Sequence, residues 1–161
     1  MKKWLLLAIT CILSSCGFHL KGTSVFDKPM PYRSWQIEGG NMQRPLETVL
    51  RRQPNVVVDD ENPDVVVKVL SATQNMSTSA VDISGSTSEY LLVLAVKVQA
   101  YRRGKPLGDP IEVNIQRYMD YSDHEVLAKE NEQNLIWRDI QTDAAEQIVH
   151  RLTYLPIVAD E

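Results

Sequence analysis

The sequence predicts an α+β fold, a two-layer α/β sandwich in which two helices pack on one face of a four- to five-stranded mixed, mostly antiparallel sheet. Three observations predict it. Long segments alternate apolar and polar side chains with a period of two, as half-buried strands do. Two other segments repeat apolar residues every three or four positions, as amphipathic helices do. The order of these segments along the chain is β-α-β-β-β-β-α.

The first residues of the chain are predicted to be a secretory leader. Lys2 and Lys3 precede an apolar run that ends at Leu13 and is shorter than the roughly 20 apolar residues that a spanning helix needs. Residues 1–15 are therefore predicted to be a signal peptide. Leu13-Ser14-Ser15-Cys16 resembles the bacterial lipobox, which implies that Cys16 becomes the acylated first residue of the mature chain. The alternative is an ordinary cleaved leader with an incidental cysteine.

The predicted acylation would attach the chain to a membrane. One acyl chain anchors only marginally, whereas the several chains of a bacterial lipoprotein anchor stably. Gly17 resembles the residue that follows the acylated cysteine in lipoproteins sorted to the outer membrane, where the periplasmic side would hold this chain. Residues 16–34 lack periodicity and are predicted to be a lipidated leash. Residues 35–161 are predicted to form a single domain.

Composition limits the function classes. The whole chain carries 17 basic and 21 acidic side chains, and loss of Lys2 and Lys3 with the leader makes the balance more acidic. An acidic domain is a poor general binder of nucleic acid, so no nucleic-acid partner is expected. Cys11 leaves with the leader and Cys16 is acylated, so the mature chain has no disulfide, no thiol nucleophile and no sulfur ligand for a metal.

The first elements are a strand and a helix. Trp35-Gln36-Ile37 predicts a short strand that ends at Gly39-Gly40. A helix follows, in which Pro45 is tolerated only in the first turn and which Pro54 ends. The apolar residues of its predicted buried face are Met42, Leu46, Val49 and Leu50.

Four strands are predicted next. Residues 55–59 contain three consecutive valines and 64–77 begin with alternating valines, with an acidic turn between them. Residues 81–88 contain Ser and Gly and predict a hairpin tip. Residues 89–101 are the strongest strand, and one of its faces is an apolar row of Leu92, Leu94, Val96, Val98 and Ala100. After a turn, residues 111–119 alternate apolar and polar side chains, which indicates one buried and one solvated face.

A long helix is predicted at the C-terminal end. Ser122 and Glu125 fit a capping box, and Pro156 is expected to stop the helix. Its apolar residues recur every four positions: Ile136, Ile140, Ala144, Ile148 and Leu152.

Candidate catalytic and metal motifs are incomplete. His124-Glu125 begins a zinc-protease pattern, but Ala128 stands where the second histidine belongs. Ser84-Gly85-Ser86 lacks the complete nucleophile elbow. The acidic run of residues 59–64 lacks the closing glutamate of a calcium loop. We therefore expect no metal, no cofactor and no enzymatic activity.

The polar segment of residues 73–87 remains open to two interpretations. Two long strands joined there would project past the helices, and a projecting unpaired edge is usually blunted. The segment is either a mobile hairpin or a surface that docks inside or against a partner.

Three stretches together resemble the LptE family of lipopolysaccharide-assembly lipoproteins. They are Cys16-Gly17-Phe18-His19-Leu20, Glu89-Tyr90, and Leu127-Ala128-Lys129-Glu130-Asn131-Glu132-Gln133 leading into Ala144-Ala145-Glu146-Gln147. The resemblance covers nearly the whole mature chain. It implies an α/β sandwich that plugs the LptD β-barrel as a heterodimer, assists its folding, binds lipopolysaccharide and aids its insertion into the outer leaflet.

The resemblance also implies a site residue. The lysine of the family's lipopolysaccharide contact is Lys129 here, and an ammonium group suits a phosphorylated lipid. The family has a basic residue near the hairpin tip, whereas residues 82–87 contain none. Other cations that could compensate are Arg102, Arg103, Lys105 and Arg117, although nothing in the sequence places them near Lys129.

Two functions of other classes stay open. One is a free-standing, periplasm-facing lipoprotein that binds an amphiphilic ligand, which needs an enclosed apolar cavity. The other is an enzyme such as a cell-wall hydrolase, for which no convergent catalytic set is present.

Overall fold

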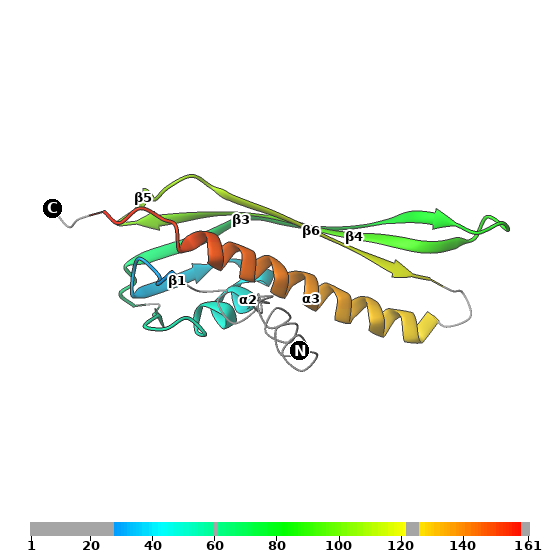
Figure 1. Cartoon of the computed structure of the whole chain (residues 1–161), viewed down its shortest axis with the longest axis horizontal. Coiled ribbons are helices and arrows are strands. Elements are labelled where there is room, and N and C mark those ends of the chain that lie inside the picture. Colours follow the sequence, from blue (N-terminus) through cyan, green and yellow to red (C-terminus); the bar gives the residue numbers. More distant parts are fainter. Residues whose placement is uncertain (1–27, 60, 122–125, 159–161) are drawn as a thin grey trace, which may run out of the picture.

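The computed structural model describes residues 28–59, 61–121 and 126–158 of the chain. Figure 1 shows an elongated molecule of two layers, a long sheet and a layer of helices beneath it. The strands are β1 (Ser34–Glu38), β2 (Val57–Val58), β3 (Val65–Val81), β4 (Thr87–Arg102), β5 (Lys105–Pro106) and β6 (Ile111–Asp120). The helices are α2 (Gly40–Leu50) and α3 (Val126–Leu152).

The sheet is mixed and mostly antiparallel, as predicted. Its strand order is β2-β1-β3-β4-β5, and β6 also pairs with β4. β1 runs parallel to β2 and β3, while the long ladders β3–β4 and β4–β6 are antiparallel. The sheet of the described residues has six strands, one more than the four to five predicted. The unexpected strand is β5, which has only two residues and lies within a segment that the sequence predicts as a turn.

Both helices pack on one face of the sheet, which confirms the predicted sandwich. On β4, the predicted buried row from Leu92 to Ala100 lies in the core. On α3, Ile140 and Leu152 are fully buried and Ile136 is partly buried. The helix therefore presents its predicted four-residue repeat to the sheet.

α2 begins earlier than predicted. Its first residue is Gly40, so Pro45 lies inside the helix rather than in its first turn. Its buried face holds the four predicted residues, and its last residue, Leu50, precedes Pro54. Gly39 stands just before the helix, where a Cβ atom would lie 2.4 Å from Cγ2 of Val69 on β3. The close approach of this turn to β3 therefore requires glycine.

β3 and β4 form a hairpin that is longer than the sequence predicts. β3 continues four residues beyond the predicted end at Ser77, which leaves Asp82–Ser86 as the tip. A bulge between Val69 and Ser71 changes which residues face the helices, from odd to even numbers. This shift explains why the segment lacks one continuous alternating pattern.

α3 lies along β4 and β6 over much of the length of the sheet (Figure 1). The predicted capping box of Ser122 and Glu125 lies outside the described residues. The helix ends at Leu152, four residues before Pro156, and the Thr153 hydroxyl donates a 2.7 Å hydrogen bond to the His150 carbonyl there.

Candidate functional site

Lys129 lies in the first turns of α3, at the end of the molecule from which the hairpin projects (Figure 1). Its Nζ lies 2.8 Å from Oε2 of Glu132, one helical turn further along. The Lys129 side chain is only 16% exposed, whereas that of Glu132 is 46% exposed. The ammonium group is therefore held by a carboxylate that water, or a competing anion, can reach. Cys16 lies outside the described residues, so its acylation stays a prediction.

The hairpin tip is organised by an acidic side chain. Asp82 accepts hydrogen bonds from the Ser84 N–H (2.8 Å), the Ser84 hydroxyl (2.6 Å) and the Ser86 N–H (2.9 Å). The Ser84 hydroxyl and then the Ser86 N–H lower the pKa of the Asp82 carboxyl below its usual range. The tip thus carries a negative charge at neutral pH, which disfavours a phosphate group there.

The other candidate cations do not join Lys129. Arg102, Arg103 and Lys105 lie at the β4–β5 turn, at the end of the sheet opposite the hairpin tip (Figure 1). Arg117 forms an ion pair with Asp143. Asp143 lies 14 residues beyond Lys129 on α3, which corresponds to about 21 Å along the helix axis. The structure therefore assembles no cluster of these cations around Lys129.

The sheet face that points away from the helices is mainly uncharged. β4 contributes a central row of Leu91, Val93, Ala95 and Lys97 to it. Serine, threonine and asparagine flank this row on β3: Ser71, Thr73, Asn75 and Ser77. On β6 the flanking residues are Glu112, Asn114, Gln116 and Tyr118. We call this surface the open face.

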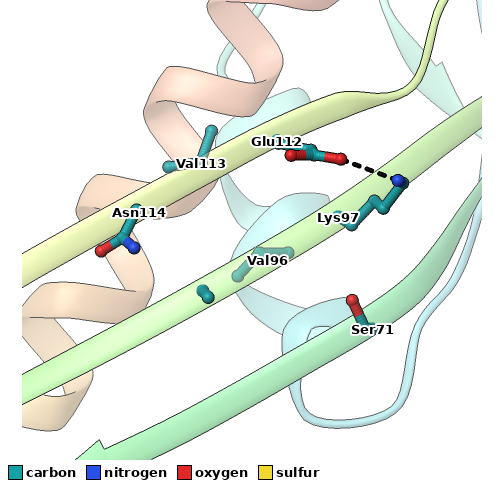
Figure 2. Close-up of a pocket in the computed structure, with 7 residues that line it drawn as sticks. Ser71, Val96, Lys97, Glu112, Val113 and Asn114 are labelled. Atoms are coloured by element: carbon teal, nitrogen blue, oxygen red, sulfur yellow. Dashed lines mark ion pairs between the residues drawn. The ribbon is translucent and has the colours of Figure 1, made fainter.

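A shallow hollow of about 340 Å³ lies on the open face and is lined by Ser71, Lys97, Glu112 and Asn114, among others (Figure 2). The Lys97 ammonium and the Glu112 carboxylate are 2.7 Å apart across the two strands. The hydrogen bond and the charge of Lys97 lower the pKa of the Glu112 carboxyl. The hollow is open to solvent, so it is not the enclosed apolar cavity that a carrier of amphiphiles needs.

The last residues of the predicted leash are fastened to the end opposite the tip. The Tyr32 hydroxyl donates a 2.8 Å hydrogen bond to the Pro156 carbonyl and accepts one of 2.9 Å from the Val158 N–H. Lys28 Nζ lies 4.4 Å from the centroid of the Tyr154 ring. The described end of the predicted leash, from Lys28 to Tyr32, therefore lies at the end of the molecule far from the hairpin tip.

Two ion pairs of the structure are absent from the predictions made from the sequence. The Lys129–Glu132 pair could have been predicted from the spacing of three residues, because residues so spaced are neighbours on a helix. The ion pair of Arg117 with Asp143 could not have been predicted, because its partners lie 26 residues apart on different elements.

With this geometry in view, comparison with known proteins decides the family. Residues 33–152 match LptE, described as Lipopolysaccharide-assembly. The match spans the two helices and six strands of the described residues. The chain belongs to the LptE family. This result confirms the resemblance found in the sequence, and membership of this assembly family makes the chain a non-enzymatic protein.

Relatives and solved structures agree with LptE membership. The LPS-assembly lipoprotein LptE of Pectobacterium atrosepticum is 28% identical over 147 residues, covering 88% of this chain and 78% of that protein. The LptE of Yersinia enterocolitica is 30% identical over 155 residues, covering 92% and 73%. These names also support the lipoprotein character predicted here, together with a part in lipopolysaccharide transport and outer-membrane assembly.

The solved structures support the fold alone. An uncharacterized lipoprotein B from Nitrosomonas europaea has a TM-score of 0.69 at 22% identity and covers 85% of this chain and 90% of its own. A minor lipoprotein from Acinetobacter baumannii has a TM-score of 0.67 at 23% identity, with 82% and 100% covered. The α/β sandwich of this LptE-family chain is thus shared with other lipoproteins.

The described residues offer no metal site and no membrane-spanning helix. They contain no group of three or more His, Cys, Asp or Glu side chains that could hold a metal ion. No helix among them is long and apolar enough to cross a membrane. His124 and Glu125, the start of the incomplete zinc pattern, lie outside the described residues.

Proposed function

We propose that this chain is an outer-membrane lipoprotein, anchored on the periplasmic side through acylated Cys16, that assists assembly of the LptD β-barrel and plugs it. In this role it binds lipopolysaccharide and aids insertion of the lipid into the outer leaflet. The family match over residues 33–152 supports the part in lipopolysaccharide assembly. The partner and the plug geometry are proposals that the surface of the molecule supports.

The open face is the observation that carries the plug proposal. The interior of a large outer-membrane barrel is polar. A plug that enters such a lumen should present polar side chains of low net charge. The open face supplies serine, threonine, asparagine and glutamine on β3 and β6, and a Lys97–Glu112 pair, on either side of the apolar Leu91, Val93 and Ala95 of β4.

The length of the hairpin supports the same geometry. The 17 residues of β3 correspond to about 56 Å at about 3.3 Å per residue. The apolar band of an outer-membrane barrel is only about 25 Å tall. The hairpin is therefore long enough for a plug inside the lumen to span the full height of the apolar band of the barrel.

Lys129 is the proposed contact for lipopolysaccharide. Lys129 belongs to the first turns of α3, the end of the helix that lies toward the hairpin tip (Figure 1), and its ammonium group is paired with the partly exposed carboxylate of Glu132. A phosphate group that displaces Glu132 gains the hydrogen bond to the ammonium group. The missing basic residue at the tip leaves Lys129 as the cation on which this proposal depends.

The experiment is a detergent co-purification of the tagged chain from outer membranes, followed by mass spectrometry. A near-equimolar large β-barrel is expected with the wild-type chain. Cys16→Ala is the matched control: it removes the acyl anchor but leaves the domain intact, so a true plug still brings the barrel with it. Recovery of the chain alone would contradict the plug and favour the free-standing lipoprotein that binds an amphiphile.

A further inference from the structure

One edge of the hairpin has no partner strand within the described part of the chain. β3 pairs with β1 only between Val65 and Lys68. From Val69 to Val81 its second edge is unpaired, and Figure 1 shows this part of β3 extending beyond the short strands beside it. An unpaired strand edge presents a row of N–H and C=O groups that can pair with another chain.

The register identifies the backbone groups on this edge. The Tyr121 N–H donates to the Ser88 carbonyl, so even-numbered residues of β4 bond to β6 and odd-numbered residues bond to β3. Between the bulges, the odd residues of β3 pair with the odd residues of β4. The N–H and C=O groups of the intervening residues therefore point to the free edge: Ala72, Gln74, Met76 and Thr78.

The opposite edge of the sheet is protected in a way that this one is not. Arg151 donates a 2.7 Å hydrogen bond to the Glu112 carbonyl of β6, and Arg117 donates one of 3.0 Å to the Gln116 carbonyl. Both carbonyls belong to even residues, which face the free edge of β6 by the same register. Among the described residues, no side chain makes a hydrogen bond to the β3 backbone between Val69 and Val81.

The composition of the free β3 edge leaves it open as well. Natural edges are blunted by charge, by proline or by bulges. Residues 69–81 contain neither a charged residue nor a proline. The bulges lie only at the two ends, which leaves Ser71–Thr78 as a regular eight-residue stretch. Met76 is 41% exposed, so apolar surface adjoins the unpaired groups.

We propose that the β3 edge from Ala72 to Thr78 binds an extended, uncharged segment of the partner polypeptide as an additional strand of the sheet. Each outward residue offers both a donor and an acceptor, repeated every second residue, about 6.8 Å apart. Another strand matches that repeat, whereas an acyl chain has neither donors nor acceptors. An uncharged segment fits because residues 69–81 provide no charge to pair with.

The origin of the added segment is also restricted. The strands of a closed barrel wall are paired on both edges, so none of them has groups left for β3. The segment therefore comes from a part of the partner outside the wall ladder. This inference rests on the proposed function for the identity of the partner, and on the structure for the position of the contact.

Amide-resolved hydrogen exchange tests the proposal. It is measured on the complex purified from outer membranes and on the same chain purified alone. We expect the amides of Ala72, Gln74, Met76 and Thr78 to exchange quickly in the free chain and at least about tenfold more slowly in the complex. The amides of Ser71, Thr73, Asn75 and Ser77 bond to β4, so they are internal controls that stay protected in both samples.

A pair of proline variants tests the edge directly. Gln74→Pro removes an outward N–H without removing a bond to β4, and proline is tolerated on edge strands. Asn114→Pro does the same on the protected edge of β6 and is the matched control. We expect Gln74→Pro to abolish the added protection at Ala72 and Met76, and Asn114→Pro to leave it unchanged. Equal thermal midpoints of the two variants show that the fold is equally intact.

The outcomes separate the two proposals. If the barrel is recovered but the four edge amides exchange as in the free chain, strand addition is wrong and the plug stands. If no barrel is recovered, the proposed function is wrong and strand addition to that partner is wrong with it. If the amides are protected in the concentrated free chain and lose protection on dilution, a second copy occupies the edge, which overturns the inference.

Discussion

Arg117 on β6 and Asp143 on α3 form an ion pair that joins the two layers of the sandwich. Arg117 stands in the row of β6 that faces the helices, between the buried Ile115 and Met119. An arginine in this row keeps its charged end in water while its stem covers apolar surface. The same side chain donates to the Gln116 carbonyl on the free edge of β6. One residue thus contributes to layer packing and to edge protection.

The first prediction concerns the stability of this contact. Both side chains are partly exposed, so a double-mutant cycle of Arg117→Ala and Asp143→Ala should give a coupling of about 0.2–1 kcal/mol in urea unfolding. Arg117→Ala should cost more than Asp143→Ala, because it also removes the stem and the bond to Gln116. A coupling of zero would mean that the pair adds nothing to the contact between layers.

The second prediction concerns the lipid contact. Lys129→Glu should weaken binding of lipopolysaccharide about tenfold or more and leave barrel association unchanged, because the ammonium group meets the phosphate. Glu132→Gln should have the opposite effect, since it removes the carboxylate that competes for Lys129. Lys105→Glu, at the far end of the sheet, is the charge-matched control. A direct titration with purified lipopolysaccharide measures all three.

Because the Lys129 side chain is largely buried, Lys129→Gln should be titrated alongside, as a variant that removes the charge and places no second carboxylate beside Glu132. Unchanged affinity in both Lys129 variants would remove this residue from the lipid contact.

The third prediction concerns pH at the hairpin tip. The pKa of Asp82 is lower in the folded chain than in an unfolded one, because the ionised carboxylate accepts the bonds from Ser84 and Ser86. A lowered folded pKa stabilises the tip above the unfolded value, and this stabilisation is lost as pH falls through the folded value. Ordering of the tip should therefore hold at neutral pH and decline below about pH 4.

Carbon-detected titration of the Asp82 carboxyl and the shifts of the Ser84 and Ser86 amides measure this transition. Asp82→Asn should give a tip whose order does not depend on pH in that range. An Asp82 that titrates at the usual aspartate value would show that the bonds to the serines are not maintained in solution.

The fourth prediction concerns the close approach of β3 and the α2 turn. Gly39→Ala places a methyl group 2.4 Å from Val69 Cγ2, so we expect a loss of about 1–3 kcal/mol in unfolding free energy. The φ angle of Gly39 is −169°, an extended conformation open to any residue, so the cost is steric and not conformational. Val69→Ala in the same chain should recover part of the loss. Additive costs of the two substitutions would contradict the proposed clash.

Patterns that arise from burial could be predicted from the sequence. The sequence predicts the alternation on β4 from Leu92 to Ala100 and the four-residue repeat of α3, because a buried face forces apolar residues to recur with the period of its element. The sandwich follows, since two amphipathic helices must cover one sheet face. The motifs around Lys129 likewise indicated the family that the comparison confirms.

The tertiary structure alone decided the features that no burial pattern records. β3 runs on to Val81 because its backbone bonds to β4, although its side chains there are small, polar and exposed. The partners of Lys129 and Arg117, and the arginines that protect one edge while β3 is left open, depend on which strands become neighbours. The order of apolar and polar residues in a sequence indicates which faces are buried. Unpaired strand edges and ion pairs between elements exist only after folding has brought distant segments together.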